Sequence, residues 1–141
     1  MALPTNKHCY FDLKAEDAIE RLVRKKETRI FNTNGMAFLT SMIYGINKGL
    51  KPVPTVNKTN AKGKLVGDCL MNNLYKAPHS EELMDAAMLS ISETGDEVLL
   101  DHDLYTSTAE GYANAGILEL HKVLSSDDPI LVSEILLNNF K

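Results

Sequence analysis

Asp101, His102 and Asp103 form the densest group of acid–base or metal-binding residue types in this chain of 141 residues. Alternate residues do not share a helical face, and no second His or Cys follows at the spacing of a zinc site. We therefore interpret the three residues as a surface turn before a long helix. His8 and Cys9 have the types of a base and a nucleophile, but adjacent side chains diverge and no orienting group can be named.

The sequence also lacks the motifs of the common enzyme classes. It has no paired-carboxylate motif, no Gly-x-Ser-x-Gly and no Gly-rich dinucleotide fingerprint. The segment AKGK at 61–64 is far shorter than a phosphate-cradling loop. His79 and His121 are expected at a helix start and on a helix surface. We therefore expect no enzyme activity, no cofactor and no metal ion.

One stretch, residues 95–124, has the pattern of a central amphipathic helix. Its apolar and small residues recur in steps of three and four over about six turns. They are Leu104, Tyr105, Ala109, Tyr112, Ala113, Gly116, Ile117, Leu120 and Leu124. Each interior glycine costs a helix roughly 1 kcal/mol relative to alanine. The glycines at 111 and 116 therefore predict that another backbone approaches this helix closely.

The small residues of this helix divide into two faces. Ala109, Ala113, Gly116 and Leu120 share one face, which we assign to the core. Gly111 and Ala115 lie four residues apart on a flank. There we expect a second contact, either with another helix of this chain or with a partner subunit. Gly111 and Ala115 are therefore the candidate partner-binding residues.

Apolar periodicity and capping residues predict further helices along the chain. They span about 14–27, 35–48, 80–94 and 129–140, with a short turn at 97–100. The stretch 65–75 has mixed periodicity, which we interpret as a helix, with a short strand as the alternative. We expect short extended pieces at 9–13 and 28–31. Ser80 is the expected cap of the helix that follows Pro78, and Gly95 its end.

These elements predict an all-α fold. We expect a compact single-domain helical bundle of five to six helices over residues 1–141, with room for a short extended segment or hairpin. Residues 1–13 are expected to form an irregular N-terminal arm. Residues 52–64 are expected to form a basic mobile loop, because Pro, Thr, Asn, Lys and Gly dominate them.

Charge is distributed unevenly along the chain. Residues 1–76 hold 13 Lys+Arg and 6 Asp+Glu, a net charge of +7, whereas residues 77–141 hold 2 and 13, a net charge of -11. Such a split suggests two surfaces with different partners, although charge often serves only solubility. The candidate phosphate-contacting residues are Arg21, Arg24, Lys25, Arg29, Lys58, Lys62 and Lys64. The cations at 21–25 also suit the negative end of a helix dipole, which is the plainer interpretation.

Composition favours a cytoplasmic protein. The hydrophobic fraction is 44% and no apolar run approaches the roughly 20 residues of a membrane span. The first residues, MALPTNKHCYFDLK, lack the apolar core of a signal peptide. Cys9 and Cys69 fit no metal spacing, so we expect reduced thiols, with a single disulfide as the alternative.

Two regions carry a family resemblance. The stretches MLSISETGDEVLL, AEGYANAGILELHKVL and DDPILVSEIL resemble the C-terminal half of the small DNA phosphorothioation-associated proteins. These are short accessory proteins encoded beside bacterial DNA sulfur-modification and restriction genes. The segment FNTNGMAFLTSMIYGINKGLKPVP is similar to an earlier helix of that family. The most specific pieces are residues 93–96 and 110–116, and residues 1–26 and 55–78 lie outside the resemblance.

The resemblance implies a subunit of a bacterial anti-phage or DNA-modification-linked system, with no catalytic residues to carry over. Our first hypothesis is a non-catalytic accessory subunit that binds a larger protein subunit through helical surfaces. The second is a direct DNA-binding protein that contacts duplex DNA through the basic N-terminal half. A third, a hydrolase or nuclease, has no support in the sequence. None of the three involves a membrane.

Overall fold

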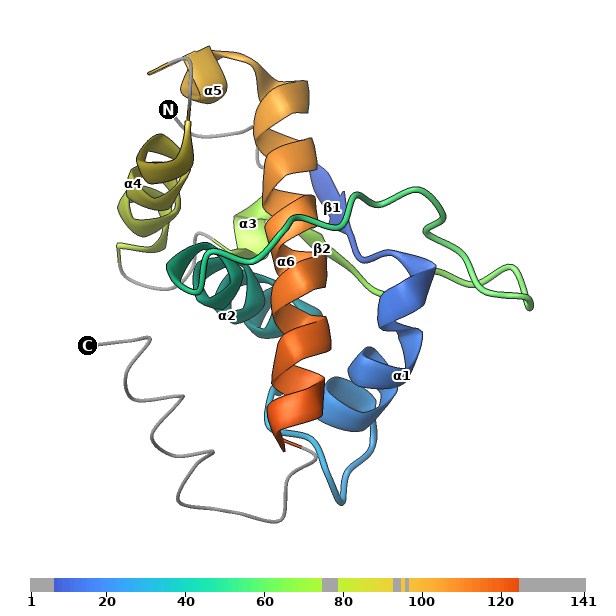
Figure 1. Ribbon diagram of the computed structural model, residues 1–141. Helices are drawn as coiled ribbons and strands as arrows, with labels where there is room; N and C mark the ends of the chain where they lie inside the picture. The colour runs from blue at the N-terminus through green and yellow to red at the C-terminus, as the bar shows by residue number, and fades with distance from the viewer. Residues whose placement is uncertain (1–6, 75–78, 93–94, 96, 125–141) are drawn as a thin grey trace.

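The computed structural model describes residues 7–74, 79–92, 95 and 97–124 (Figure 1). Its longest element is helix α6 (His102–Leu124), around which the other elements pack. Helix α2 (Asn34–Asn47) crosses α6 and makes the most extensive contact with it. Both helices bury wide surfaces, so the core lies mainly along their crossing. The long amphipathic helix expected from periodicity is therefore confirmed.

Glycine and other small residues let α2 and α6 approach backbone to backbone. A Cβ atom on Gly116 would overlap the carbonyl oxygen of Ser41, and one on Gly45 would lie 2.5 Å from that of Tyr112. The close backbone approach predicted from the glycines of α6 is thus confirmed at Gly116. The core face predicted for α6 is confirmed too, since its members are buried: Ala109, Ala113, Gly116 and Leu120.

Helix α2 begins and ends one residue before the predicted 35 and 48. The Thr33 hydroxyl accepts a hydrogen bond of 3.1 Å from the backbone N–H of Met36, which caps the first turn. At the other end Gly49 has a φ of +64°, the left-handed conformation that favours glycine after a helix.

The first predicted helix is shorter and less regular than expected. A 3₁₀ turn η1 (Leu13–Ala15) leads into α1 (Glu16–Ile19), and a π-helical turn η2 (Glu20–Arg24) follows. Lys25 is extended, and the N–H groups of Ile30 and Phe31 both donate to the Leu22 carbonyl. The returning chain therefore ends this helix at Arg24, three residues before the predicted boundary.

The fold is mostly helical but not purely so. Strand β1 (His8–Tyr10) pairs antiparallel with β2 (Asp68–Leu70), and β2 continues into the short helix α3 (Met71–Leu74). The mixed periodicity of 65–75 thus reflects a strand followed by a helical turn, which corrects the all-α prediction. The expected extended piece at 9–13 is a strand over 8–10 instead, and Leu13 already belongs to the turn η1. From residue 8 the predicted irregular arm is thus paired in the sheet.

The acidic part of the chain supplies α4 (Ser80–Ile91) and α5 (Glu97–Leu100). His79 rather than Ser80 precedes the first turn of α4, with a φ of 62°, and the buried Ser80 hydroxyl has no hydrogen-bond partner in the described part of the chain. Helix α4 ends at Ile91, three residues before the predicted end at 94, and Gly95, with a φ of +71°, lies in a turn beyond it. The helix predicted at 129–140 lies outside the described residues. Among the described helices, none has the length and apolarity to cross a membrane.

Candidate functional site

The residues with the chemistry of a metal or acid–base site have structural roles. The Asp101 carboxylate accepts hydrogen bonds from the backbone N–H groups of Asp103 (3.1 Å) and Leu104 (3.0 Å), and so caps α6. Of the three residues predicted to form a turn before the helix, only Asp101 lies outside it, because α6 begins at His102. His8 lies 3.3 Å from Asp68 across the sheet, whereas Cys9 is buried on the opposite face. Within the described ranges, no three His, Cys, Asp or Glu side chains lie close enough to hold a metal ion.

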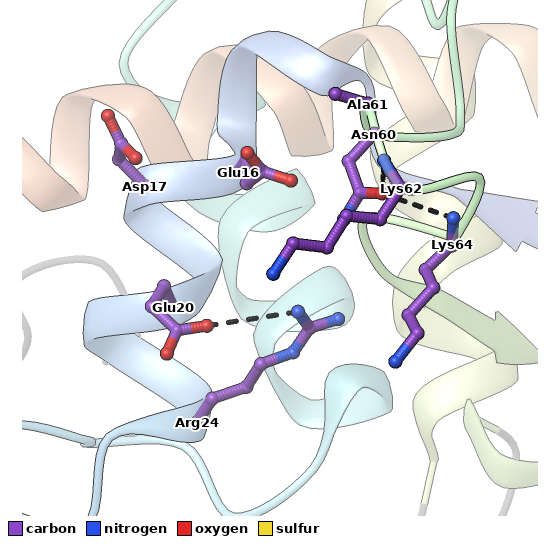
Figure 2. Close-up of a pocket in the computed structure, with 8 residues that line it drawn as sticks. All are labelled: Glu16, Asp17, Glu20, Arg24, Asn60, Ala61, Lys62 and Lys64. Atoms are coloured by element: carbon purple, nitrogen blue, oxygen red, sulfur yellow. Dashed lines mark hydrogen bonds and ion pairs between the residues drawn. The ribbon is translucent and has the colours of Figure 1, made fainter.

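Three of the predicted phosphate-contacting residues surround one hollow. Arg24, Lys62 and Lys64 line a hollow of about 480 Å³ between the α1–η2 segment and the hairpin 59–65 (Figure 2). The Asn60 side-chain oxygen accepts from the N–H groups of Lys62 (2.9 Å) and Lys64 (3.1 Å), and this fixes the hairpin. Gly63, with a φ of +75°, completes the turn.

The opposite wall of this hollow is acidic. Glu16, Asp17 and Glu20 of the helical segment line it, and they match the three cations in number. Glu16 points toward the hairpin and Glu20 toward Arg24, whereas the Asp17 side chain is turned away from the hairpin (Figure 2). Arg24 is also engaged internally, since its guanidinium donates to the Val66 carbonyl at 2.6 Å and lies 3.8 Å from Glu20. A phosphate group in the hollow would meet three carboxylates as well as the cations. The hollow is therefore lined by both positive and negative side chains, unlike a site that binds phosphate through cations alone.

The other basic residues lie apart from the hollow. Lys58 places its ammonium group 4.3 Å from the centroid of the Tyr10 ring, a cation–π contact that anchors the loop to β1. Lys25 and Arg29 are exposed at the turn after η2, and Arg21 is half-buried on η2 itself. None of these four lines the hollow. The seven predicted residues therefore do not form one phosphate-contacting cluster.

A buried polar group that the sequence did not reveal fixes the loop 52–57. Asn114, fully buried in α6, donates to the Val53 carbonyl and the Thr55 hydroxyl, both at 2.8 Å. The Asn114 side-chain oxygen accepts from the backbone N–H of Asp12 at 2.9 Å. All polar atoms of this amide are thus used, which is what burial of an asparagine requires.

Asp12 completes the anchor from the N-terminal arm. Its carboxylate accepts from the backbone N–H groups of Val56 and Asn57, both at 2.9 Å, and of Lys14 at 3.0 Å. Burial alone would raise the pKa of Asp12, but these three N–H donors, with the Lys14 charge, outweigh burial and hold the pKa below its ordinary value. The partners of Asp12 and Asn114 are distant in sequence, so no local pattern announces them.

With its backbone anchored in this way, the segment 52–56 presents an apolar edge to solvent. Val53 and Thr55 point inward, whereas Pro52, Pro54 and Val56 are exposed, and Val56 is 86% exposed. We call this segment the 52–56 ridge. It crosses in front of α6 in Figure 1, as the green chain between α2 and the hairpin.

A hollow lies on each side of the ridge, and Pro54 lines both. One, of about 400 Å³, has apolar walls from Leu13, Pro54 and Val56. The other, of about 420 Å³, lies between the ridge, the end of α4 and α6. Its lining residues are mainly apolar: Pro52, Pro54, Ile91, Ser107, Thr108, Gly111 and Tyr112. The ridge and both hollows therefore form one continuous surface.

Gly111, a predicted partner-binding residue, lies at the floor of the second hollow. Its carbonyl accepts from the Val53 N–H at 2.9 Å, and a Cβ atom at Gly111 would lie 2.9 Å from the Pro52 Cβ. The flank expected to meet a helix or a partner is thus covered at Gly111 by a loop of the same chain. Ala115 is buried as well. The exposed part of this surface is the ridge and not the two residues of α6.

Comparison of the chain with protein-family models, curated proteins and solved structures finds no match. The function must therefore be argued from the site and from the family resemblance of the sequence.

Proposed function

We propose that this protein is a non-catalytic accessory subunit of a bacterial DNA-modification-linked or anti-phage defence complex in the cytoplasm, and that it binds a larger protein subunit. One observation carries the proposal of partner binding. The 52–56 ridge holds exposed apolar side chains on a backbone fixed by buried hydrogen bonds, between two hollows. The resemblance to phosphorothioation-associated proteins supports the kind of system.

The ridge has the physical properties of a protein-binding surface. Contiguous exposed apolar side chains on a soluble protein often mark such surfaces. Because Asp12 and Asn114 already order the backbone, binding through the ridge costs less conformational entropy than ordering a free loop. Both properties favour Val56 as an anchoring side chain in a pocket of the partner.

Charges around the ridge indicate what the partner offers. Lys14 lines the first hollow, Lys51 precedes the ridge and Lys58 follows it, and all three are exposed. A complementary partner has an apolar pocket rimmed by acidic residues, because opposite charges at an interface rim favour correct encounter.

Val56→Asp tests this proposal. We expect the variant to lose binding to the product of an adjacent gene by about tenfold or more, because hot-spot truncations commonly cost 2 kcal/mol or more. The measurement is co-purification in high salt after co-expression, followed by titration of the purified partner.

Leu100→Asp is the matched control. Leu100 is also a strongly exposed aliphatic residue, at 69%, but it lies on α5 away from the ridge. Both variants should keep the melting temperature of the unchanged protein. Full binding by Val56→Asp with loss of binding by Leu100→Asp would move the interface to α5 and overturn the assignment to the ridge.

Direct DNA binding is the alternative function. The convergence of Lys62 and Lys64 beside Arg24 favours it, because neither lysine has a carboxylate partner within the described structure. The acidic wall of the same hollow and the internal contacts of Arg24 and Lys58 oppose it. We therefore rank it second.

A further inference from the structure

The two cysteines of the chain lie directly opposite each other in the small sheet. In the antiparallel register of β1 and β2, Cys9 pairs with Cys69. The N–H of Phe11 donates to the Gly67 carbonyl (2.8 Å), and the N–H of Met71 donates to the Lys7 carbonyl (3.0 Å). Hydrogen-bonded and non-hydrogen-bonded pairs alternate along an antiparallel ladder, so Cys9 and Cys69, midway between these two bonds, form a hydrogen-bonded pair. The Cα atoms of such a pair lie about 5.5 Å apart. Disulfides span Cα separations of about 4.4–6.8 Å, which includes this value.

The two side chains lie on the same side of the sheet. Directly paired residues of an antiparallel sheet project on the same face. Here that face is turned to the core, because Cys9 and Cys69 are 0% and 5% exposed. Both are free thiols in the structure. The Cβ atoms of a hydrogen-bonded pair lie about 5.5 Å apart, and a disulfide requires about 3.5–4.5 Å. A bond between Cys9 and Cys69 would therefore need a small local approach of the strands as well as side-chain rotation, without a change of strand register.

We propose that Cys9 and Cys69 are a site of reversible disulfide formation, which covalently clamps β1 to β2. The oxidant is a small-molecule disulfide of the glutathione class. One cysteine thiolate attacks this disulfide, forms a mixed disulfide and displaces one small-molecule thiol. The second cysteine then attacks the mixed disulfide and displaces the other thiol. The two cysteines lose two protons and two electrons in total, and the oxidant is reduced to two thiols.

Burial makes this reaction slow in the closed sheet. Burial raises the pKa of Cys69 to about 12 and that of Cys9 well above its ordinary value, and the nearby carboxylate of Glu110 acts in the same direction on both. Asp68 adds to the shift at Cys69, whereas the Lys7 charge opposes it at Cys9. At neutral pH both thiols are therefore protonated as well as covered, and exchange requires separation of β1 from β2.

Separation of the strands must break contacts with the core. Each strand has only three residues, but Cys9 and Cys69 belong to the hydrophobic core, and the N–H of Tyr10 donates to Glu110 of α6 at 2.7 Å. Oxidation should therefore proceed at the rate at which this part of the fold opens, and denaturant should accelerate it.

Oxidation would close a covalent loop from residue 9 to residue 69. This loop contains α1, α2 and the 52–56 ridge, so the clamp acts on the N-terminal arm to which the ridge is bound. A long closed loop restricts the unfolded chain strongly. We expect the melting temperature to rise on oxidation by about 5 °C or more.

The experiment incubates the full chain with oxidised glutathione in mildly alkaline buffer, then alkylates the remaining thiols and measures intact mass without reductant. The expected product is a monomer that has lost two hydrogen atoms, has no alkylatable thiol and reverts with dithiothreitol. Peptide mapping should join the segments that contain Cys9 and Cys69. The melting temperature of the same sample should rise.

Cys9→Ala and Cys69→Ala are the matched controls, and each should show no rise in melting temperature with the oxidant. If either variant fails to fold, peptide mapping of the unchanged chain still decides the question. Persistent alkylation of both thiols, mixed disulfides at both sites or a disulfide-linked dimer would overturn the proposal. The intact mass, the peptide map and the melting temperature are all measured without the proposed partner protein.

Discussion

At the scale of single residues, Asp12 accepts hydrogen bonds from three backbone N–H groups: that of Val56 in the ridge, that of Asn57 directly after it, and that of Lys14. We expect Asp12→Ala to destabilise the fold by roughly 1–3 kcal/mol, because it leaves buried donors without an acceptor. Asp12→Asn retains an acceptor oxygen and should cost less. Equal losses for both variants, measured by urea denaturation, would show that the carboxylate oxygens are not what holds the ridge.

The same carboxylate predicts a dependence of stability on pH. Because the folded-state pKa of Asp12 is lowered, its ionised form stabilises the fold at pH values above the ordinary Asp pKa of 3.8. This contribution is lost as the pH falls below 3.8 and through the lowered folded-state value. The stability difference between the unchanged protein and Asp12→Asn should therefore shrink over that acidic range, as measured by denaturation at a series of pH values.

For Glu110 we expect the opposite dependence of stability on pH. Burial raises the pKa of Glu110, and the Tyr10 N–H and the charges of Lys58 and Lys7 only partly offset this effect. A raised folded-state pKa means that stability is lost as the pH rises from the ordinary value of 4.5 through the raised value. We expect Glu110→Gln, which still accepts from Tyr10, to be more stable than the unchanged protein at neutral pH. Below pH 4.5 the difference should close, and a difference that persists there would refute this account.

At the scale of elements, the crossing of α2 and α6 depends on glycines that face backbone atoms. Gly116→Ala and Gly45→Ala each place a Cβ against a carbonyl oxygen of the other helix, which cannot rotate away. We expect each to destabilise the fold by about 1–3 kcal/mol or more. At Gly111 the added Cβ would lie 2.9 Å from the Pro52 Cβ, in a loop held by the hydrogen bond from the Val53 N–H to the Gly111 carbonyl, so the loop must shift. The roughly 1 kcal/mol that alanine gains in helix propensity offsets part of this cost. Gly111→Ala should therefore destabilise the fold less than the other two variants, and thermal melting of the three compares them directly.

The elements that sequence predicts best are those with long, regular periodicity. Helices α2 and α6 repeat their apolar faces over many turns, so their approximate extents could be inferred. The strands could be indicated only as an extended piece at 9–13 and as the alternative for 65–75, because three residues are too few to establish an alternation. The end of η2 depends on Ile30 and Phe31, whose N–H groups return to the Leu22 carbonyl. The ridge depends on hydrogen bonds to Asp12 and Asn114, which lie 44 to 61 residues away from the ridge residues that they bind. Such contacts belong to the tertiary fold and leave no local pattern.

At the scale of the whole molecule, the division of charge along the chain does not become a simple division in space. The net charge of +7 over residues 1–76 includes Glu16, Asp17 and Glu20, which line the same hollow as the hairpin lysines. In the other direction, Lys7 of the basic half lies 3.4 Å from Asp103 of the acidic half. Basic residues thus contact acidic ones both within and between the two halves. The surface left for a polyanion is smaller than the sequence alone suggests.

This arrangement predicts weak DNA binding by the isolated chain. Each phosphate neutralised by a cation contributes about -0.9 to the slope of log affinity against log salt. With Lys62 and Lys64 as the unpaired cations of the hollow, we expect a slope of only about -2 and no measurable binding at physiological salt. Lys62→Gln/Lys64→Gln should abolish what binding remains at low salt, whereas Lys25→Gln, an exposed cation outside the hollow, is the matched control. Fluorescence anisotropy with a labelled duplex over a salt series measures both the slope and the residual affinity.

A steep slope with binding that persists at physiological salt would show that cations outside the hollow also reach the phosphates. DNA binding would then become the preferred function, ahead of binding to a protein partner. A shallow slope that the double substitution removes would instead confine the anion contact to the hairpin, where the acidic wall limits its strength.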